Sequence, residues 1–439
     1  MYNDPREILN HSAMARLQYV VVALTVALNA LDGFDVMAIS FASPGIYAEW
    51  GITPAGLGLV LSMELWGMAA GSLLLGGIAD QYGRKPTILA CLFMMTIGMY
   101  LVTTTPSLTV LSIWRFITGL GIGGMLASIN AQAAEFSNLK NRPMAIAIMS
   151  AGYPIGGILG GAVVTQLLKY YDWRSVFYFG TAVTMLMIPL VALLMPESVH
   201  WLVRKRPANY LGRINATMTK LGHKALAMIP VFPEEAQHRT FVDIFNKTML
   251  ATTLCVTAAY FLHIVTFYFI LKWVPQLVVQ MGFSPASAGG VLTWASVGGA
   301  VGALTFGLLS KRFGLKGLTI FMFVCSAIGT ILFGQTTPNL AVLSALVALA
   351  GYFINAGIVG MYSIIAQVFP THVRASGTGF AIGVGRGGSA LSPILAGFLL
   401  QGGMELPMVS VVMAMGSLLA AGALLFLKLD RGPAAPGGR

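Results

Sequence analysis

Charged residues are what this sequence has least of. Asp, Glu, Lys and Arg make up 9% of its 439 residues, whereas a soluble domain carries about 25%. Hydrophobic residues reach 56%, and the mean hydropathy is +0.79. So few charges cannot build the polar surface of a water-soluble fold of this size. The composition therefore argues against a soluble enzyme, a nucleic-acid-binding protein and a disordered protein.

Signatures of catalysis and of ATP use are also missing. There is no glycine loop ending in Gly-Lys-Ser/Thr, and no Ser/His/Asp or metal-ligand spacing stands out. Cys91, Cys255 and Cys325 lie in separate apolar runs, as small core residues do. We therefore expect a protein that is not an enzyme, needs no cofactor or metal, and either draws on a gradient or acts as a facilitator.

We expect no cleavable signal peptide at the N-terminus. Residues 1–15 are polar, and the apolar run that follows, 17–43, contains two aspartates. That run is too long and too charged for a signal sequence. We expect it to form the first transmembrane helix.

Twelve apolar runs are long enough to cross a bilayer, which takes roughly 20 helical residues. They fall at 17–43, 55–79, 86–105, 108–134, 144–168, 175–195, 249–271, 286–309, 317–335, 338–366, 376–400 and 407–428. Turn-forming residues separate them, among them Ser43-Pro44-Gly45 after the first run. The sequence therefore predicts an all-α membrane protein of twelve transmembrane helices. It comprises a six-helix bundle over 1–195, a polar and basic linker over 196–248, and a second six-helix bundle over 249–439.

Lys and Arg are distributed unevenly between the two ends of these helices. Of the 26, 21 lie on the side of the N-terminus, and Lys169, Arg174 and Lys272 lie on the opposite side. Arg115 and Arg386 lie within apolar runs. Because cytoplasmic loops retain Lys and Arg, we expect both termini in the cytoplasm and the chain in the cell's inner (plasma) membrane. The net charge of +11 then reflects topology rather than nucleic-acid binding.

The two halves repeat a loop pattern. The sequences GGIADQYGRK at 76–85 and GLLSKRFGLK at 307–316 share glycine, aromatic and lysine positions in the same order and spacing. Arg142 and Arg374 also match between the halves. They are 232 positions apart, and the two loops are 231 positions apart. Two matches at nearly one offset indicate an internal duplication and two pseudo-symmetric bundles.

The first apolar run contains two carboxylates. Asp32 and Asp35 share one face of a helix, and a carboxylate in a bilayer is costly unless it meets water, a cation or a proton. Counted from the outer ends of their runs, Asp35, Glu64 and Arg115 lie at similar depth. We therefore expect Arg115 to pair with one of these acids, and we interpret all four residues as proton-coupling groups. The alternatives are a pair of acids at the outer mouth and, for Glu64, a structural salt bridge.

Arg386 is the other cation within an apolar run. It lies about 18 Å into its helix, and no acidic residue of the second half falls at that depth in the sequence. Guanidinium binds carboxylates through paired hydrogen bonds, so we expect Arg386 to hold a substrate carboxylate. Pairing with Asp32 is the alternative.

Aromatic and polar side chains recur at helical spacing in the second half. Tyr260, His263 and Phe267 share one face, and Tyr352 and Asn355 share another. Such stripes also arise from packing, and a hydrogen bond to a neighbouring helix is the alternative role for His263. The candidate substrate site comprises Arg386, Asp35, Arg115, Tyr153, Tyr260, His263, Phe267, Tyr352 and Asn355.

Glycine predicts close helix contacts in both halves. Gly152, Gly156 and Gly160 recur at four-residue spacing in the run 144–168, and six glycines lie between Gly377 and Gly388. Small residues at this spacing let helix backbones approach one another.

The twelve helices, the two halves and the loop at 76–85 together resemble the major facilitator superfamily. Arg115-Phe116 with the following glycines resembles its helix 4 motif, and residues 152–157 (GYPIGG) resemble its helix 5 motif. Residues 32–35 (DGFD) resemble the helix 1 signature of the aromatic acid:proton symporter family. Residues 269–275, Arg374 and Arg386 also look like that family. The resemblance implies proton-coupled import of an aromatic carboxylate, such as benzoate, hydroxybenzoate or protocatechuate, by alternating access.

The resemblance also implies a cytoplasmic gate built from loop acids and arginines. The second half departs from the pattern, because Lys311, Leu315 and Gln367 stand where the first half has an acid, an arginine and an acid. We therefore expect the first half to carry most of this clasp. The expected gate residues are Gly76, Asp80, Gly83, Arg84, Lys85, Glu135, Arg142, Glu197 and Arg374.

Other functions stay open at this point. A porter for another organic anion, such as nicotinate, muconate or a quinate-like acid, would need the same cation. Residues 196–202 (PESVHWL) also resemble the sugar porters, but the seventh apolar run, 249–271, lacks the paired glutamines of a sugar or polyol porter. A nutrient sensor and a drug-exporting antiporter are further alternatives. The expected partners are a small organic anion, protons and the lipid bilayer, with no nucleic acid, and the chain is expected to be a monomer.

Overall fold

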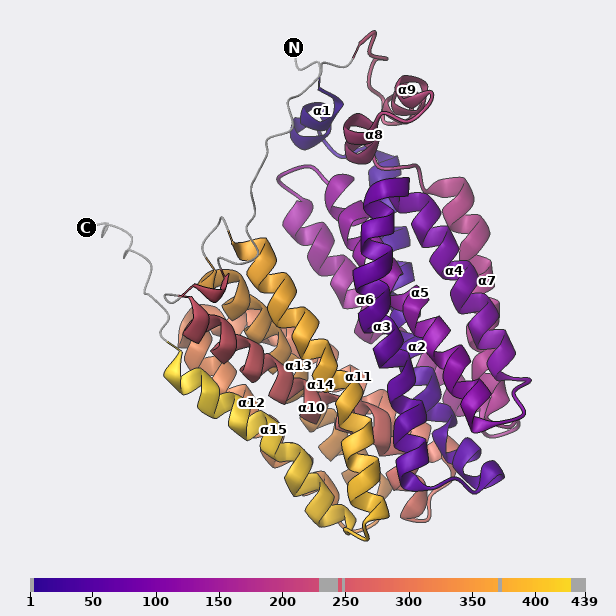
Figure 1. Cartoon of the computed structure of the whole chain (residues 1–439), viewed down its shortest axis with the longest axis vertical. Helices are drawn as coiled ribbons and strands as arrows, with labels where there is room; N and C mark the ends of the chain where they lie inside the picture. The colour runs from indigo at the N-terminus through magenta and orange to yellow at the C-terminus, as the bar shows by residue number, and fades with distance from the viewer. Residues whose placement is uncertain (1–3, 229–243, 247–248, 370–372, 428–439) are drawn as a thin grey trace. The chain divides into compact units, whose positions relative to one another are not determined.

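The chain is helical throughout the part that can be described. The computed structural model describes residues 4–228, 244–246, 249–369 and 373–427, without the side chains of 374–376. These ranges hold fifteen α-helices and no strand (Figure 1). The helices are α1 (Pro5–His11), α2 (Arg16–Trp50), α3 (Pro54–Tyr82), α4 (Arg84–Val102), α5 (Leu108–Glu135), α6 (Arg142–Leu167), α7 (Arg174–Leu194), α8 (Val199–Lys205), α9 (Tyr210–Lys220), α10 (Leu250–Gln280), α11 (Pro285–Phe313), α12 (Leu315–Gln335), α13 (Leu340–Val368), α14 (Arg374–Gln401) and α15 (Leu406–Phe426).

Twelve of these helices have the length of membrane spans. They contain 19 to 35 residues, and 19 residues already span about 28 Å. Eleven are also apolar enough to be candidate spans. The twelfth, the glycine-rich α14, is not among the eleven, although it is 28 residues long. The predicted all-α membrane fold is confirmed.

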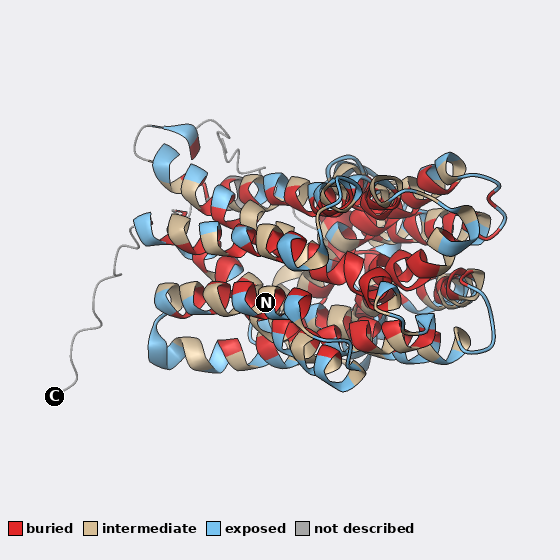
Figure 2. Cartoon of the chain, turned by 90° about the horizontal axis from the view of Figure 1, so that it is seen from below, coloured by how far each residue is buried: buried red, intermediate tan, exposed pale blue. Residues whose placement is uncertain are grey.

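The outward faces of the helices carry the exposed residues (Figure 2). Many of these residues are large and apolar; Leu73 is 78% exposed and Phe426 is 86% exposed. A soluble protein seldom exposes so many large apolar side chains. They form the surface that faces lipid acyl chains.

The chain divides into two compact units. Unit 1 comprises Met1–Glu235 and Ser284–Thr293, and unit 2 comprises Ala236–Phe283 and Trp294–Arg439. One boundary between the units falls inside the predicted linker at 196–248, and the other two enclose residues 284–293, which include the start of α11. That linker contains the helices α8 and α9, which the sequence analysis did not predict.

The predicted turn at Ser43-Pro44-Gly45 is wrong. Helix α2 continues through Pro44 and ends at Trp50, before Gly51 in the left-handed conformation (φ 55°). Proline deprives the carbonyl four residues earlier of its helical hydrogen bond. Here the hydroxyl of Ser43 donates to that carbonyl, on Ser40, at 2.8 Å. A neighbouring hydroxyl thus lets the helix pass the proline, as happens in membrane helices.

The predicted position of Lys272 in an outer loop is also wrong. Helix α10 runs on to Gln280, passing Pro275, and Lys272 is fully buried. The apolar run 249–271 ends at this lysine in the sequence, so hydropathy alone placed the helix end too early. Unit 2 therefore has a buried cation that the sequence analysis assigned to solvent.

The duplication seen in the loops extends to backbone contacts. A methyl group on Gly67 would overlap the carbonyl oxygen of Phe116, where α3 meets α5. A methyl group on Gly298, the equivalent position of the second half, would overlap the carbonyl oxygen of Ala348, where α11 meets α13. Three further contacts repeat in this way: Gly71 on Leu120 with Gly302 on Tyr352, Gly119 on Glu64 with Gly351 on Ala295, and Gly156 on Ala30 with Gly388 on Phe261.

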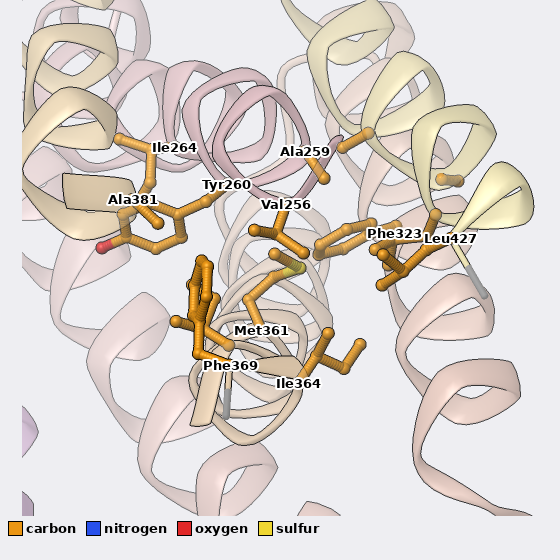
Figure 3. Packing of buried hydrophobic residues seen from close by; sticks show 14 of the residues in the cluster. Val256, Ala259, Tyr260, Ile264, Phe323, Met361, Ile364, Phe369, Ala381 and Leu427 are labelled. Atoms are coloured by element: carbon orange, nitrogen blue, oxygen red, sulfur yellow. The ribbon is translucent and has the colours of Figure 1, made fainter. Parts of the chain in front are cut away.

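An apolar core fills unit 2 on the side of α10 that faces α12, α13 and α14. Tyr260 of α10, Phe323 of α12, Met361 of α13 and Ala381 of α14 are all buried there (Figure 3). This packing leaves Tyr260 with one end in the core and its hydroxyl among polar neighbours.

The short helices α1, α8 and α9 form a small cap at one end of unit 1 (Figure 1). Leu9 of α1, Trp201 and Leu202 of α8, and Ile214 and Met218 of α9 share one buried apolar cluster. Hydrogen bonds tie the cap to the spans, because Arg142 donates to the side chain of Asn10 at 2.7 Å and Leu139 donates to its backbone carbonyl at 3.0 Å.

Candidate transport site

Unit 1 contains a fully buried ion pair. Arg115 of α5 pairs with Glu64 of α3, and both side chains are fully buried. Arg115 also donates to the backbone carbonyl of Asp35 at 3.2 Å and to the Met99 sulfur at 3.5 Å. Its guanidinium lies over the ring of Phe177, 5.5 Å from the ring centre. The structure thus brings together three of the four residues predicted to handle protons.

Asp35 is the polar residue beside this pair. Its carboxylate is fully buried, and neither carboxylate oxygen has a hydrogen-bond partner among the described residues. The charges of Arg115 and Glu64 both act on it. We call Asp35, Glu64 and Arg115 the ion-pair cluster. The cluster has two acids for one cation, so it carries one net negative charge when every acid is ionised.

Asp35 lies deeper than its sequence position suggested. Its apolar run was expected to end at residue 43, but α2 ends at Trp50, 15 residues beyond Asp35. At 1.5 Å per residue this is about 22 Å. The interpretation of the two aspartates as acids at an outer mouth therefore loses its support.

Asp32 occupies the same helix one turn earlier. It is 2% exposed, and its charge acts on the thiol of Cys91 in α4. Between the two aspartates, Gly33 packs so closely on α6 that a methyl group there would overlap the carbonyl oxygen of Tyr153. Tyr153, a predicted substrate residue, is half-buried at this contact. The glycine thus holds α6 against the helix that carries the acids.

The predicted substrate residues of α10 and α14 meet in unit 2. The hydroxyl of Tyr260 lies 3.1 Å from that of Tyr362 on α13, and the charge of Arg386 acts on Tyr260. Gly385 faces the Tyr260 ring so closely that a methyl group would overlap it. Arg386 itself is half-buried, and the hydroxyl of Ser389 donates to its backbone carbonyl at 2.5 Å. Arg386 contributes a guanidinium to this region, and Tyr260 and Tyr362 contribute phenol hydroxyls; both groups are donors suited to a carboxylate.

The other predicted substrate residues of unit 2, Tyr352, Asn355 and Phe267, have contacts with residues outside the Tyr260–Tyr362 pair. Tyr352 is hydrogen-bonded to Thr305 at 2.8 Å, and the Asn355 amide donates to its own helix, at the Gly351 carbonyl. Phe267 is half-buried, and its ring packs edge-on against that of Tyr268.

His263 has the surroundings of a packing residue. It is fully buried, and its ring nitrogens lie 2.9 Å from the Ser417 hydroxyl and 3.0 Å from the Ile354 carbonyl. Its ring stacks on Phe323 at 4.1 Å. These contacts join α10 to three neighbouring helices, which favours the alternative that the sequence had left open for this histidine.

Three of the predicted gate residues, Asp80, Arg84 and Glu135, meet near the cap, where α3 and α5 end and α4 begins. Arg84 pairs with Asp80 at 2.6 Å and with Glu135 at 3.4 Å. Arg204 of α8 also pairs with Asp80, at 3.2 Å, and the hydroxyl of Ser198 donates to Glu135. We call this set the gate cluster. Sequence reasoning missed Ser198 and Arg204, although Ser198 is a typical helix N-cap residue and Arg204 lies in the noted basic run.

Glu197 serves the gate cluster as a helix cap. Its carboxylate accepts hydrogen bonds from the backbone N–H groups of Arg84 at 2.9 Å, Lys85 at 3.4 Å and Ser198 at 2.8 Å. Burial raises the pKa of Glu197, and these three hydrogen bonds act in the opposite direction. Gly83 has φ 115°, and a methyl group there would overlap the Glu197 carboxylate. The predicted glycine is needed for both reasons.

The remaining gate residues lie apart from these ion pairs. Arg142 donates to the Ala134 carbonyl at 2.9 Å and so caps the end of α5. Lys85 donates to the Ala192 carbonyl at 2.7 Å, at the end of α7. Gly76 packs loosely within α3. Arg374 begins α14, and its side chain lies outside the described part of the chain.

Comparison with known proteins agrees with this architecture. The family model described as Major Facilitator Superfamily matches residues 25–290 and 256–439. The 4-hydroxybenzoate transporter PcaK of Pseudomonas aeruginosa is 29% identical over 96% of this chain and 95% of its own length. The gallate transporter of Pseudomonas putida is 26% identical over 96% of this chain and 94% of its own.

A solved structure of a D-xylose-proton symporter superposes with a TM-score of 0.74 at 17% identity, covering 94% of this chain and 99% of that one. At this identity the superposition shows the fold alone. The family match spans nearly the whole chain, and the relatives are transporters rather than enzymes. The chain is therefore a multi-pass membrane transporter that belongs to the Major Facilitator Superfamily.

Proposed function

We propose that this transporter imports an aromatic carboxylate together with protons by alternating access. The observation that carries the proposal is Asp35, a buried carboxylate without hydrogen-bond partners in the described part of the chain, beside an Arg–Glu pair. The names of the relatives, which include transporters of gallate, 4-hydroxybenzoate and benzoate, support the substrate class. The chain would act as a monomer in the inner membrane, with both termini in the cytoplasm.

The ion-pair cluster suits a site that binds and releases a proton. With Asp35 ionised, two carboxylates share one guanidinium, and the excess negative charge is buried. Burying an uncompensated charge costs several kcal/mol. Protonation of Asp35 leaves a neutral acid beside a neutral Glu64–Arg115 pair. A change between states that differ in water access would therefore favour uptake of the proton on one side and its release on the other.

Arg386 and the two tyrosines suit the substrate anion. The guanidinium would hold the carboxylate through paired hydrogen bonds, and Tyr260 and Tyr362 would add hydroxyl donors and aromatic surface. Nothing in this chemistry distinguishes benzoate from a hydroxylated or heterocyclic ring acid. The choice among benzoate, hydroxybenzoate, protocatechuate and nicotinate is therefore a matter for competition experiments.

The number of protons decides which gradient drives uptake. One proton with one monoanion is electroneutral and gains about 1.4 kcal/mol per pH unit. Protonation of Asp32 as well would add one net charge, worth about 2.3 kcal/mol per 100 mV. Two buried aspartates permit either stoichiometry.

The test is uptake of radiolabelled 4-hydroxybenzoate into proteoliposomes under an imposed pH gradient. We expect accumulation that stops when the gradient is collapsed and that Asp35→Asn abolishes. Benzoate, gallate, nicotinate, muconate and quinate compete in parallel, and labelled xylose tests a sugar porter. Uptake that is unchanged both when the gradient is collapsed and in the Asp35→Asn variant would reject proton coupling. Uptake of xylose that Arg386→Ala leaves unchanged would reject the anion site.

A further inference from the structure

Unit 1 contains a cavity at the end of α2 opposite the cap. Its volume is about 400 Å³, which is within the range of small-molecule sites in proteins. Three segments line it: α2 contributes Ala48 and Glu49, the loop between α6 and α7 contributes Tyr171 and Asp172, and α11 contributes Pro285. All five residues belong to unit 1. No residue of the ion-pair cluster or of the gate cluster lines this cavity.

The aromatic wall of the cavity is held in place by close packing. Trp173 is 3% exposed and lies on Gly45, where an added methyl group would overlap its side chain. Its ring meets that of Trp50 edge-on, with the ring centres 5.9 Å apart. The lining residue Phe41 is 1% exposed, and a methyl group on Gly161 of α6 would lie 3.1 Å from its ring. Because this wall is pre-formed, a ligand does not have to order it.

Both carboxylates of the cavity pair with Arg174, the first residue of α7. Its guanidinium lies 2.6 Å from Glu49 and 3.1 Å from Asp172. With a hydrogen bond from Nε to the Thr103 carbonyl at 3.2 Å, these contacts occupy four of its five N–H groups. Lys169, the cation of the α6–α7 loop, forms no ion pair with either acid among the described residues. The acids therefore outnumber the cation that pairs with them by two to one.

The two acids remain accessible to a ligand. The side chains of Glu49 and Asp172 are 39% and 59% exposed, and Tyr171, beside Asp172, is 66% exposed. A carboxylate accepts several hydrogen bonds, and the face of an aromatic ring attracts a cation. An anion would instead meet two carboxylates and a guanidinium with one N–H group left. The charges at this cavity therefore favour a cation, and its wall favours an apolar body.

We propose that this cavity binds a small organic cation, an ammonium group attached to an aromatic or apolar body. The ammonium group lies at Asp172 and Glu49, and the body packs against Phe41 and Trp173. The occupant contacts α2, the α6–α7 loop and the start of α11 at once, so it holds these three segments together. This ligand is opposite in charge to the aromatic carboxylate proposed as the transported substrate, and the site is separate from the residues proposed to bind that substrate.

The test measures binding of radiolabelled 2-phenylethylammonium to full-length protein in detergent by equilibrium dialysis. We expect saturable binding of one molecule per chain. Two unlabelled competitors carry the same ring and differ in charge. Neutral 2-phenylethanol should displace the label only at higher concentration, and anionic 3-phenylpropionate should not displace it.

Three variants locate the bound cation. Asp172→Asn removes one negative charge but keeps the Glu49–Arg174 pair, and it should weaken binding about two- to fivefold, as expected for an exposed charge pair. Ala48→Leu places a larger side chain in the cavity and should abolish binding. Glu405→Gln removes an exposed acid from the α14–α15 loop and should leave binding unchanged. Melting temperatures without ligand verify that each variant is folded.

Three results would overturn the site: no saturable binding of the cation, displacement by 3-phenylpropionate as effective as by the unlabelled cation, or full binding in both Asp172→Asn and Ala48→Leu. If Ala48→Leu does not fold, Asp172→Asn and the competitors decide. No measurement here uses the transported acid or requires uptake, so the cation site and the proposed function fail independently.

Discussion

The loops after α3 and after α11 begin with the same sequence pattern and differ in chemistry. The lysine is equivalent in both: Lys85 donates to the end of α7, and Lys316, its counterpart in the second loop, donates to the Leu425 and Leu427 carbonyls at the end of α15. The acid and the arginine are not equivalent. Asp80 and Arg84 pair with each other, whereas the matching positions in unit 2 hold lysine and leucine.

The charged residues inside the long helices of the two units also differ: unit 1 has acids where unit 2 has none. The long helices of unit 1 bury three acids, Asp32, Asp35 and Glu64, whereas the sequence of the long helices of unit 2 contains no acid. Unit 2 instead has the cations Lys272 and Arg386 with tyrosines and hydroxyls. The glycine contacts, in contrast, repeat at equivalent positions of the two halves. Duplication thus kept the contacts that set helix spacing, while the charged side chains diverged, with buried acids in one unit and cations in the other.

We expect the largest loss of stability and uptake when the buried Arg115–Glu64 ion pair of unit 1 is disrupted. Arg115→Met leaves Glu64 buried without its cation, which costs about 3–5 kcal/mol and should abolish uptake. Arg115→Met with Glu64→Met removes both charges and should recover most of the stability but not the transport. Melting temperatures in detergent, with uptake in proteoliposomes, measure both.

The matched comparison is Arg386→Met in unit 2. That guanidinium is half-buried, so its removal should lower the melting temperature far less while still abolishing anion uptake. If Arg115→Met were as stable as the parent protein, the contrast between the two units would be lost.

The next largest loss of stability is expected when the glycine contacts that both units share are disrupted. Gly71→Ala and Gly302→Ala each force a methyl group against a neighbouring carbonyl, and overpacking of this kind costs about 1–3 kcal/mol. We expect similar losses in both, seen as lower melting temperatures. Gly307→Ala, where the added methyl group meets open space, is the control and should not destabilise. A loss confined to one unit would contradict a shared packing scheme.

The sequence predicted the spans well because hydropathy and turn residues report directly on burial in lipid. It failed at Pro44 and at Lys272, where a proline and a charge each suggest a helix end but the helix continues. The Ser43 hydroxyl that satisfies the Ser40 carbonyl is visible only in the structure. Periodicity likewise placed His263 on a candidate face but could not show that Ser417 and Ile354 hold its ring.

The site was partly predictable for a related reason. Depth counting named the acids of the first half as candidate partners of Arg115, and Glu64 is the acid that pairs with it, although Asp35 lies farther from its helix end than the count assumed. The gate acids and arginines came from the resemblance. The role of Glu197 as a cap of α4 could not be predicted, because it joins positions that lie far apart in the sequence.

A moderate effect tests the uneven gate. Asp80→Asn removes the acid that joins Arg84 to Arg204, and we expect a several-fold loss of transport. Its stability change should be small, because the Asp80 side chain is 57% exposed and exposed pairs contribute about 0–1 kcal/mol. Lys311→Ala, the matching position of unit 2, should change transport little. Equal losses in properly inserted protein would show that both loops carry the clasp.

The smallest effect concerns pH and the cap, which belongs to unit 1. Burial lowers the pKa of His200 below its ordinary value of 6.5. The nearby charged groups are Glu135, Arg142, Arg6 and Asp4. Because the unfolded chain binds the proton more readily, stability is fully present above pH 6.5 and falls as the pH drops below it, toward the lower folded pKa.

We therefore expect the melting temperature to decline between about pH 7 and pH 5, with a contribution of at most about 1.4 kcal/mol per pH unit from this histidine. His200→Gln should flatten the decline, whereas His223→Gln, the same substitution after α9, should keep it. An unchanged slope in His200→Gln would mean that other groups set the acid sensitivity. A flattened slope would assign it to the cap, so that acidification would loosen the gate cluster of unit 1, where Ser198 and Arg204 bind its acids.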